Sequence, residues 1–112
     1  MRKPERRKNR SDKANVALDL FLDSIRKAEG IDAVAVSTED GFLVAGAGAN
    51  GTDIEWMGAL GAASKRKTFE WEEHTLHVQK LEVNRVQMFL TCAGRAARAA
   101  AVKSGFERIL AA

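Results

Sequence analysis

The residues best suited by type and spacing to hold a ligand form the G-x-G-x-x-G segment Gly46-Ala47-Gly48-Ala49-Asn50-Gly51. In a dinucleotide-binding fold, such glycines let the backbone approach a pyrophosphate, and an acidic residue follows about 20 positions later. Glu70, Glu72 and Glu73 lie near that distance. All of the glycines precede Thr52, the expected helix cap, so none can pack a helix on a strand. We interpret the segment as a connecting loop and expect no cofactor.

The two histidines, His74 and His77, are three positions apart in a segment expected to be a strand. Successive side chains of a strand point to opposite faces, so these imidazoles should not share a metal ion. No Asp or Cys stands at ligand spacing beside them, and no Ser, Cys or Lys has a plausible general base. The carboxylates of Glu70, Glu72 and Glu73 suit a solvated strand edge, where charge discourages aggregation. The sequence therefore predicts neither a metal site nor a catalytic set.

The segment that should carry the function is a short helix over residues 52–67. Thr52 is a favourable N-cap, and Glu55 three residues later completes a capping box. Basic residues 65–67 would complement the negative end of the helix dipole. This helix should connect two parts of a sheet.

On a helical wheel, this segment has two apolar arcs with only a thin polar stripe between them. A helix on the outside of a small domain can bury one arc on its own sheet. The second arc needs another cover, which we expect to be a second copy of the chain. The first arc consists of Ile54, Met57, Gly58 and Gly61, and the second of Trp56, Leu60 and Ala63.

The composition indicates one soluble globular domain. A chain of 112 residues, with 46% hydrophobic and 29% charged residues, can bury one core. No apolar run approaches the roughly 20 residues that span a bilayer, and the N-terminus lacks the apolar region of a secretory signal. We therefore expect a cytoplasmic protein. The single cysteine, Cys92, ends an apolar run and should be a buried, inert thiol.

The net charge of +3 is concentrated at the N-terminus. Residues 1–12 carry no apolar side chain after Met1 and are expected to form a disordered basic tail. This tail could be a solvated extension, or it could contact an anionic membrane surface or partner. Contact with nucleic acid phosphates is the third alternative, but no aromatic residue supports base stacking, so no specific nucleic acid is expected. The basic side chains are Arg2, Lys3, Arg6, Arg7, Lys8 and Arg10.

The rest of the chain alternates between helical and strand periodicity. Apolar residues at spacings of three and four predict a first helix from Lys13 to Gly30. A five-stranded antiparallel sheet fits the order of elements, because the 52–67 helix is the single crossover between a hairpin and a meander. Strands are expected over 31–37, 42–45, 68–71, 74–83 and 85–91, and a last helix over 95–110.

This pattern resembles the roadblock / dynein light chain family, and within it the bacterial type of roadblock domain. The family is a relative of the profilin-like and longin sandwiches. The resemblance implies an α+β (α/β) three-layer sandwich for residues 13–112. Its five-stranded antiparallel sheet would carry one helix on one face and two on the other. The resemblance rests on segments 30–36, 39–45, 76–78 and 88–91 and on the helix rich in alanine and glycine.

The resemblance also implies a function: a non-enzymatic homodimer that regulates a small Ras-like GTPase or serves as an adaptor. In such a dimer, two sheets join at the short third strand and the central helices pair across the seam. The alternatives are a small ligand-sensing or scaffold module of the profilin-like fold, and a basic tail that binds anionic surfaces. The expected dimer contacts are Ile54, Met57, Gly58, Gly61, Ala62, Phe69 and Trp71, and the expected GTPase contacts are Asp53, Glu55, Trp56 and Arg66.

Overall fold

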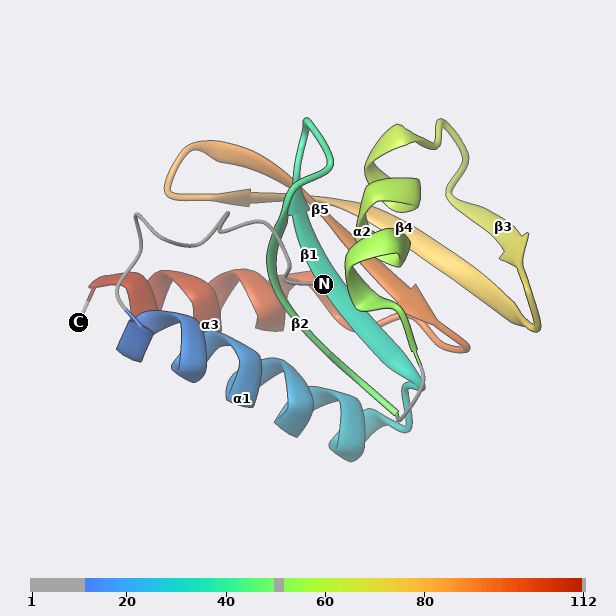
Figure 1. Ribbon diagram of the computed structural model, residues 1–112. Coiled ribbons are helices and arrows are strands. Elements are labelled where there is room, and N and C mark those ends of the chain that lie inside the picture. The colour runs from blue at the N-terminus through green and yellow to red at the C-terminus, as the bar shows by residue number, and fades with distance from the viewer. Residues whose placement is uncertain (1–11, 50–51, 112) are drawn as a thin grey trace.

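A computed structural model describes residues 12–49 and 52–111. The strands form one antiparallel sheet in the order β2-β1-β5-β4-β3. Helices α1 and α3 lie side by side on one face and α2 lies alone on the other (Figure 1), which confirms the predicted three layers. The elements are α1 (Asp12–Glu29), β1 (Ala33–Thr38), β2 (Leu43–Gly48), α2 (Ile54–Ala63), β3 (Thr68–Trp71), β4 (His74–Val83), β5 (Val86–Ala93) and α3 (Ala99–Ala111).

The larger half of the core lies between the sheet and the α1–α3 pair. Leu18 and Leu22 of α1 are fully buried there, as their helical spacing predicts. The rings of Phe21 and Phe106 meet edge to face at 6.2 Å and join the two helices. Cys92 is buried in the same half, which confirms the expected burial, and desolvation raises the pKa of its thiol to about 11.

The smaller half of the core depends on two glycines of α2. A Cβ atom at Gly61 would collide with the side chain of Thr91, and one at Gly58 would lie 3.4 Å from the Cβ of Ala35. Beside them, the buried Ser37 hydroxyl donates a 3.0 Å hydrogen bond to the Gly58 carbonyl. At these two positions the backbone of the helix, rather than a long side chain, contacts the sheet.

The sequence predicted that the whole G-x-G-x-x-G segment is a connecting loop, and this prediction is wrong for Gly46 and Gly48. Gly46 and Gly48 belong to β2, where they pair with Ala35 and Ala33. Both glycines lie under the side chain of Ile54, and a Cβ atom at Gly48 would come within 2.6 Å of its Cδ1. The spacing of two residues places both glycines on one face of the strand, so they make room for α2.

The limits of α2 also differ from the prediction. Its N-cap is Asp53, whose Oδ1 accepts a 3.0 Å hydrogen bond from the Trp56 N–H, so Thr52 is not the cap. The helix ends at Ala63, because Ser64 has extended backbone angles and residues 65–67 lead into β3. At the other end of the chain, α1 begins at Asp12, one residue before the predicted limit of the domain. The rest of the predicted tail lies outside the described residues.

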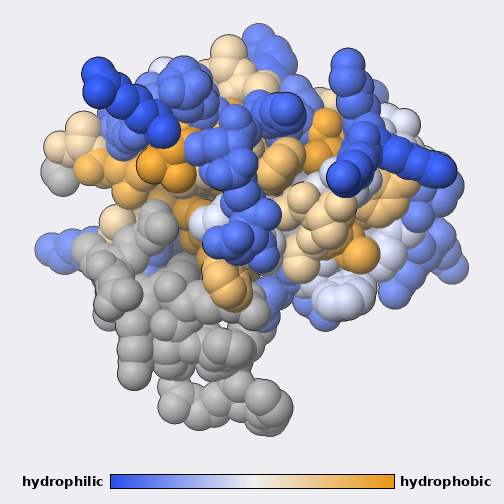
Figure 2. All heavy atoms as spheres, turned by 90° about the horizontal axis from the view of Figure 1, so that it is seen from above, coloured by the Kyte–Doolittle hydropathy of each residue, from blue (hydrophilic) through white to orange (hydrophobic). Residues whose placement is uncertain are grey.

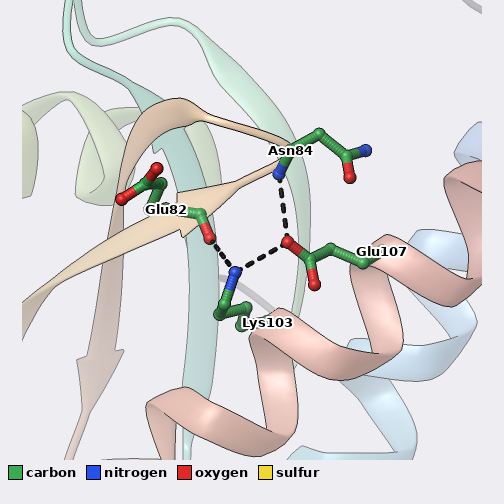
Figure 3. A network of polar contacts seen from close by, with 4 residues as sticks. All are labelled: Glu82, Asn84, Lys103 and Glu107. Carbon is green, nitrogen blue, oxygen red and sulfur yellow. Dashed lines mark hydrogen bonds and ion pairs between the residues drawn. The ribbon is translucent and has the colours of Figure 1, made fainter.

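A polar network fixes the β4–β5 hairpin to α3 (Figure 3). Lys103 donates hydrogen bonds to the Glu82 carbonyl at 2.9 Å and to the Glu107 carboxylate at 2.7 Å. The same carboxylate accepts a 3.1 Å bond from the N–H of Asn84, which has a positive φ in the turn. These contacts, the Lys103 bond first, lower the pKa of the Glu107 carboxyl. Asn84 and Arg85, which both have a positive φ, form the turn between β4 and β5.

Replacing Gly61 with alanine should lower the free energy of unfolding by about 1–3 kcal/mol, because the new methyl group overpacks against Thr91. In an isolated helix the same change stabilises by about 1 kcal/mol, so the two effects have opposite signs. Urea denaturation followed by circular dichroism measures the change.

The control is Gly61→Ala in a Thr91→Ala background, where the cost should fall by at least about 1 kcal/mol. A Gly61→Ala variant as stable as the parent would mean that α2 does not lie this close to β5.

Candidate interaction surface on helix α2

The outward side of α2 is apolar, which is unusual for a helix on the surface of a domain. Glu55 is the only charged residue between Ile54 and Ala63. Trp56 is 55% exposed, and Ala63 is exposed on the same side. Phe42, 49% exposed, follows the turn residue Gly41, which lies against Ala59 of α2. An apolar helix face of this kind is typical of a surface that another molecule covers. We call the residues Trp56, Ala59, Leu60 and Ala63 the outer face of α2.

The structure corrects part of the predicted dimer interface. Met57, Gly58 and Gly61 are buried against the chain's own sheet, so they are not available to a second copy. Ile54 is half-buried over β2, and Ala62 is half-buried at the other end of the helix. Since the inner arc of α2 covers the sheet, the arc left for a partner is the outer face.

The remaining predicted dimer residues, Phe69 and Trp71, lie on β3, which is an edge strand of the sheet. Their side chains are half-buried against the cluster that contains Met57 and Leu76. The Trp71 ring also lies 6.5 Å from the ring of His74. The two side chains thus face the α2 layer, and the outer backbone edge of β3 is what a second copy could pair with.

The residues predicted to contact a GTPase do not form one cluster. Asp53 and Trp56 are joined by the cap hydrogen bond, and Glu55 lies between them in the first turn. Arg66 is exposed beyond the other end of α2, where its N–H bonds the Ser64 hydroxyl at 3.0 Å. The ten residues of α2 rise about 15 Å, so a partner that contacts both ends must lie along the helix.

A basic groove adjoins the C-terminal end of α2. The groove has a volume of about 940 Å³ and lies between the α2–β3 connection and strands β4 and β5. Val78 and Phe89 contribute apolar surface, and Lys80 of β4 faces the connection across it. Sequence reasoning missed this groove, because residues 65–67 were predicted to be helical. Its residues are Ala62, Ala63, Ser64, Lys65, Arg66, Lys67, Val78, Gln79, Lys80 and Phe89.

Few polar groups gather elsewhere on the described part of the chain. His74 Nδ1 lies 3.7 Å from an oxygen of Asp32, a neighbour that the sequence analysis did not anticipate because the two residues are far apart in the chain. No three His, Cys, Asp or Glu side chains among the described residues are arranged to hold a metal ion. Within the same residues, no helix is long and apolar enough to cross a membrane. The predicted anionic-surface residues of the tail, from Arg2 to Arg10, lie outside the described ranges.

Comparison with solved structures relates this fold to MglB of Myxococcus xanthus, a roadblock-domain small GTPase regulator. The match has a TM-score of 0.52 at 12% sequence identity, and it covers 97% of this chain and 87% of that chain. The likeness shows the roadblock-like fold that the sequence predicted. No protein-family model matches the sequence, and no curated protein sequence matches it either.

Replacing Asp53 with alanine should destabilise α2 by about 1 kcal/mol, because the Trp56 N–H would lose its acceptor. The amide of Trp56 should then exchange with solvent faster in a hydrogen-exchange measurement. Asp53→Asn keeps an acceptor oxygen and should retain most of the protection.

Thr52→Ala is the matched control and should change the exchange little. Faster Trp56 exchange in Thr52→Ala than in Asp53→Ala would contradict the assignment of the cap.

Proposed function

We propose that this chain is a non-enzymatic, dimeric regulator or adaptor of a small Ras-like GTPase. The observation that carries the proposal is the apolar outer face of α2, next to an open sheet edge at β3. The roadblock-like fold supports it, because MglB has this fold and is a small GTPase regulator.

The proposed dimer uses two surfaces that the monomer leaves uncovered. The outer edge of β3 offers backbone N–H and C=O groups to the same strand of a second copy. The outer face of α2 would then meet its counterpart across the two-fold axis, as an isologous interface requires. Trp56 is the natural anchor, since large aromatic residues dominate the energetics of many interfaces.

The proposed action on the GTPase needs no chemistry from this chain. Ras-like proteins differ between nucleotide states mainly in their switch loops, so a rigid surface that fits one arrangement of the loops shifts the equilibrium. Asp53 and Glu55 at one end of α2, with Arg66 beyond the other, would leave charges of both signs beside the paired helices, whereas Trp56 is assigned to the subunit interface. A single GTPase that lies across the axis would cover both copies of this surface.

The full-length chain of 12.2 kDa should be a dimer at micromolar concentration, because water-exposed apolar area on α2 is removed by pairing. Light scattering coupled to gel filtration gives the mass. Trp56→Lys should shift the population to monomer by placing a charge in the paired face.

Val86→Lys is the matched control, since Val86 is 51% exposed at the tip of the β4–β5 hairpin, and this variant should stay dimeric. A folded parent that is monomeric at these concentrations would overturn the dimer.

A purified Ras-like GTPase from the same genome should bind with a preference for either the GDP or the GTP form, at two copies of this chain per GTPase. Biolayer interferometry with GDP and a non-hydrolysable GTP analogue measures the preference. The double variant Glu55→Lys/Arg66→Glu should weaken the complex about tenfold or more and leave the mass of the dimer unchanged.

If the dimer forms but no GTPase binds in either state, the GTPase proposal is wrong and an adaptor function remains. If the double variant also loses the dimer, then Glu55 and Arg66 belong to the subunit interface instead.

A further inference from the structure

The open part of strand β4 borders the basic groove. Strand β3 pairs with β4 only as far as the Thr68–His77 pair, and the last bond runs from the Val78 N–H to the Lys67 carbonyl at 2.7 Å. Strand β4 continues to Val83, so five of its residues extend past this bond. The α2–β3 connection leaves the sheet at this point, and the space between it and β4 is the groove.

The direction of the β4 backbone groups follows from this last bond. In an antiparallel sheet, backbone groups of alternate residues point to the same side, so those of Lys80 and Glu82 point outward like those of Val78. The bond from Lys103 to the Glu82 carbonyl agrees with this direction. Among the described residues, Lys80 has no backbone hydrogen-bond partner on that side. One stretch of strand edge therefore lies open directly beside the groove.

All charged side chains that line the groove are basic. Lys65, Arg66 and Lys67 line one side and Lys80 lines the other, and no acidic residue lines the groove. Val78 and Phe89 add apolar surface between them. Figure 2, which views the molecule from above, shows apolar regions bordered by strongly hydrophilic side chains. A second basic groove or the basic N-terminal segment of this chain would be repelled, so the surface fits an acidic partner.

We propose that the groove binds an extended acidic segment of another protein, which adds to the sheet as a strand beside Lys80. The segment's backbone would pair with the N–H and C=O of Lys80, as in other cases of strand addition to an open edge. Alternate side chains of the segment face the groove, so apolar residues cover Val78 and Phe89. Carboxylates at either end of the apolar residues meet Lys80 and Lys65–Lys67. The groove adjoins the outer face of α2, with which it shares Ala63, and the binding of an acidic segment does not depend on the GTPase proposal.

The probe is a fluorescein-labelled peptide, Asp-Glu-Val-Thr-Val-Glu-Asp, which places two valines between two aspartates on one face when extended. Fluorescence anisotropy with the full-length protein should show saturable binding. The double variant Lys65→Glu/Lys80→Glu should weaken it about tenfold or more, because it reverses charge on both sides of the groove. The matched control Lys27→Glu/Arg108→Glu makes the same change of net charge on α1 and α3 and should leave the affinity within about twofold.

A second peptide of equal charge, with N-methyl groups on its three central residues, separates strand addition from attraction of charges. It cannot donate backbone hydrogen bonds there, so it should bind at least about tenfold more weakly. Hydrogen exchange followed by NMR should show protection of the Lys80 amide only with the unmethylated peptide.

Equal binding of both peptides would overturn the proposal, because it would mean that charge alone attracts the segment. An equal loss of peptide affinity in the control variant Lys27→Glu/Arg108→Glu would also overturn the proposal. Binding of phosphatidylserine vesicles that depends on Lys65 and Lys80, without any binding of the peptide, would assign the groove to a lipid surface instead.

Discussion

The close contact between the backbone of α2 and the sheet determines most of what this molecule presents to a partner. Gly58 and Gly61 let the helix approach β1 and β5 until a methyl group at Gly61 would collide with Thr91. On the same face, Gly46 and Gly48 of β2 make room for Ile54. Small residues on both sides thus replace the long side chains that usually separate a helix from a sheet.

This contact decides which side of α2 is free. Since the glycines and Met57 cover the sheet, the tryptophan at position 56 points away from it, and the described part of its own chain leaves more than half of this residue exposed. The helix is also short, and it ends at Ala63. The sheet continues beyond it, so the half-buried Phe89 and the edge of the largely buried Val78 line the groove beside the basic connection. The outer face of α2 and the groove are therefore two consequences of one packing arrangement.

The edges of the sheet are protected to different degrees. On β2, the N–H of Gly46 is bonded by the Asp19 carboxylate from α1 at 3.1 Å. At the far end of β4, Lys103 donates a hydrogen bond to the Glu82 carbonyl. On the β3 side of the sheet, the outer edge of β3 and the outward backbone groups of Lys80 remain open within the described part of the chain. Open edges invite added strands, so the parts of the sheet without such a cover are those expected to meet other chains.

Local sequence patterns were enough to find the elements and their order. The helical periodicity of α1 and α3 and the strand periodicity of β4 involve residues close together in the chain. The bounds of β3 and β4 agree with the predicted ones, and the sheet with one helix opposite two follows from the order of elements. Burial of Cys92 could likewise be predicted, because it ends an apolar run.

What the sequence left undecided depended on contacts between distant segments. The glycines at 46 and 48 match a phosphate-binding pattern, and only the position of Ile54 above them shows that they serve packing. Both Thr52 and Asp53 are good cap residues, and the hydrogen bond to Trp56 selects the second. A helical wheel shows two apolar arcs on α2 but cannot say which one faces the sheet, because that choice is made by Ala35 and Thr91 on other strands. The groove was hidden for the same reason: it exists only where residues 65–67, folded out of the helix, lie across from Lys80 of β4.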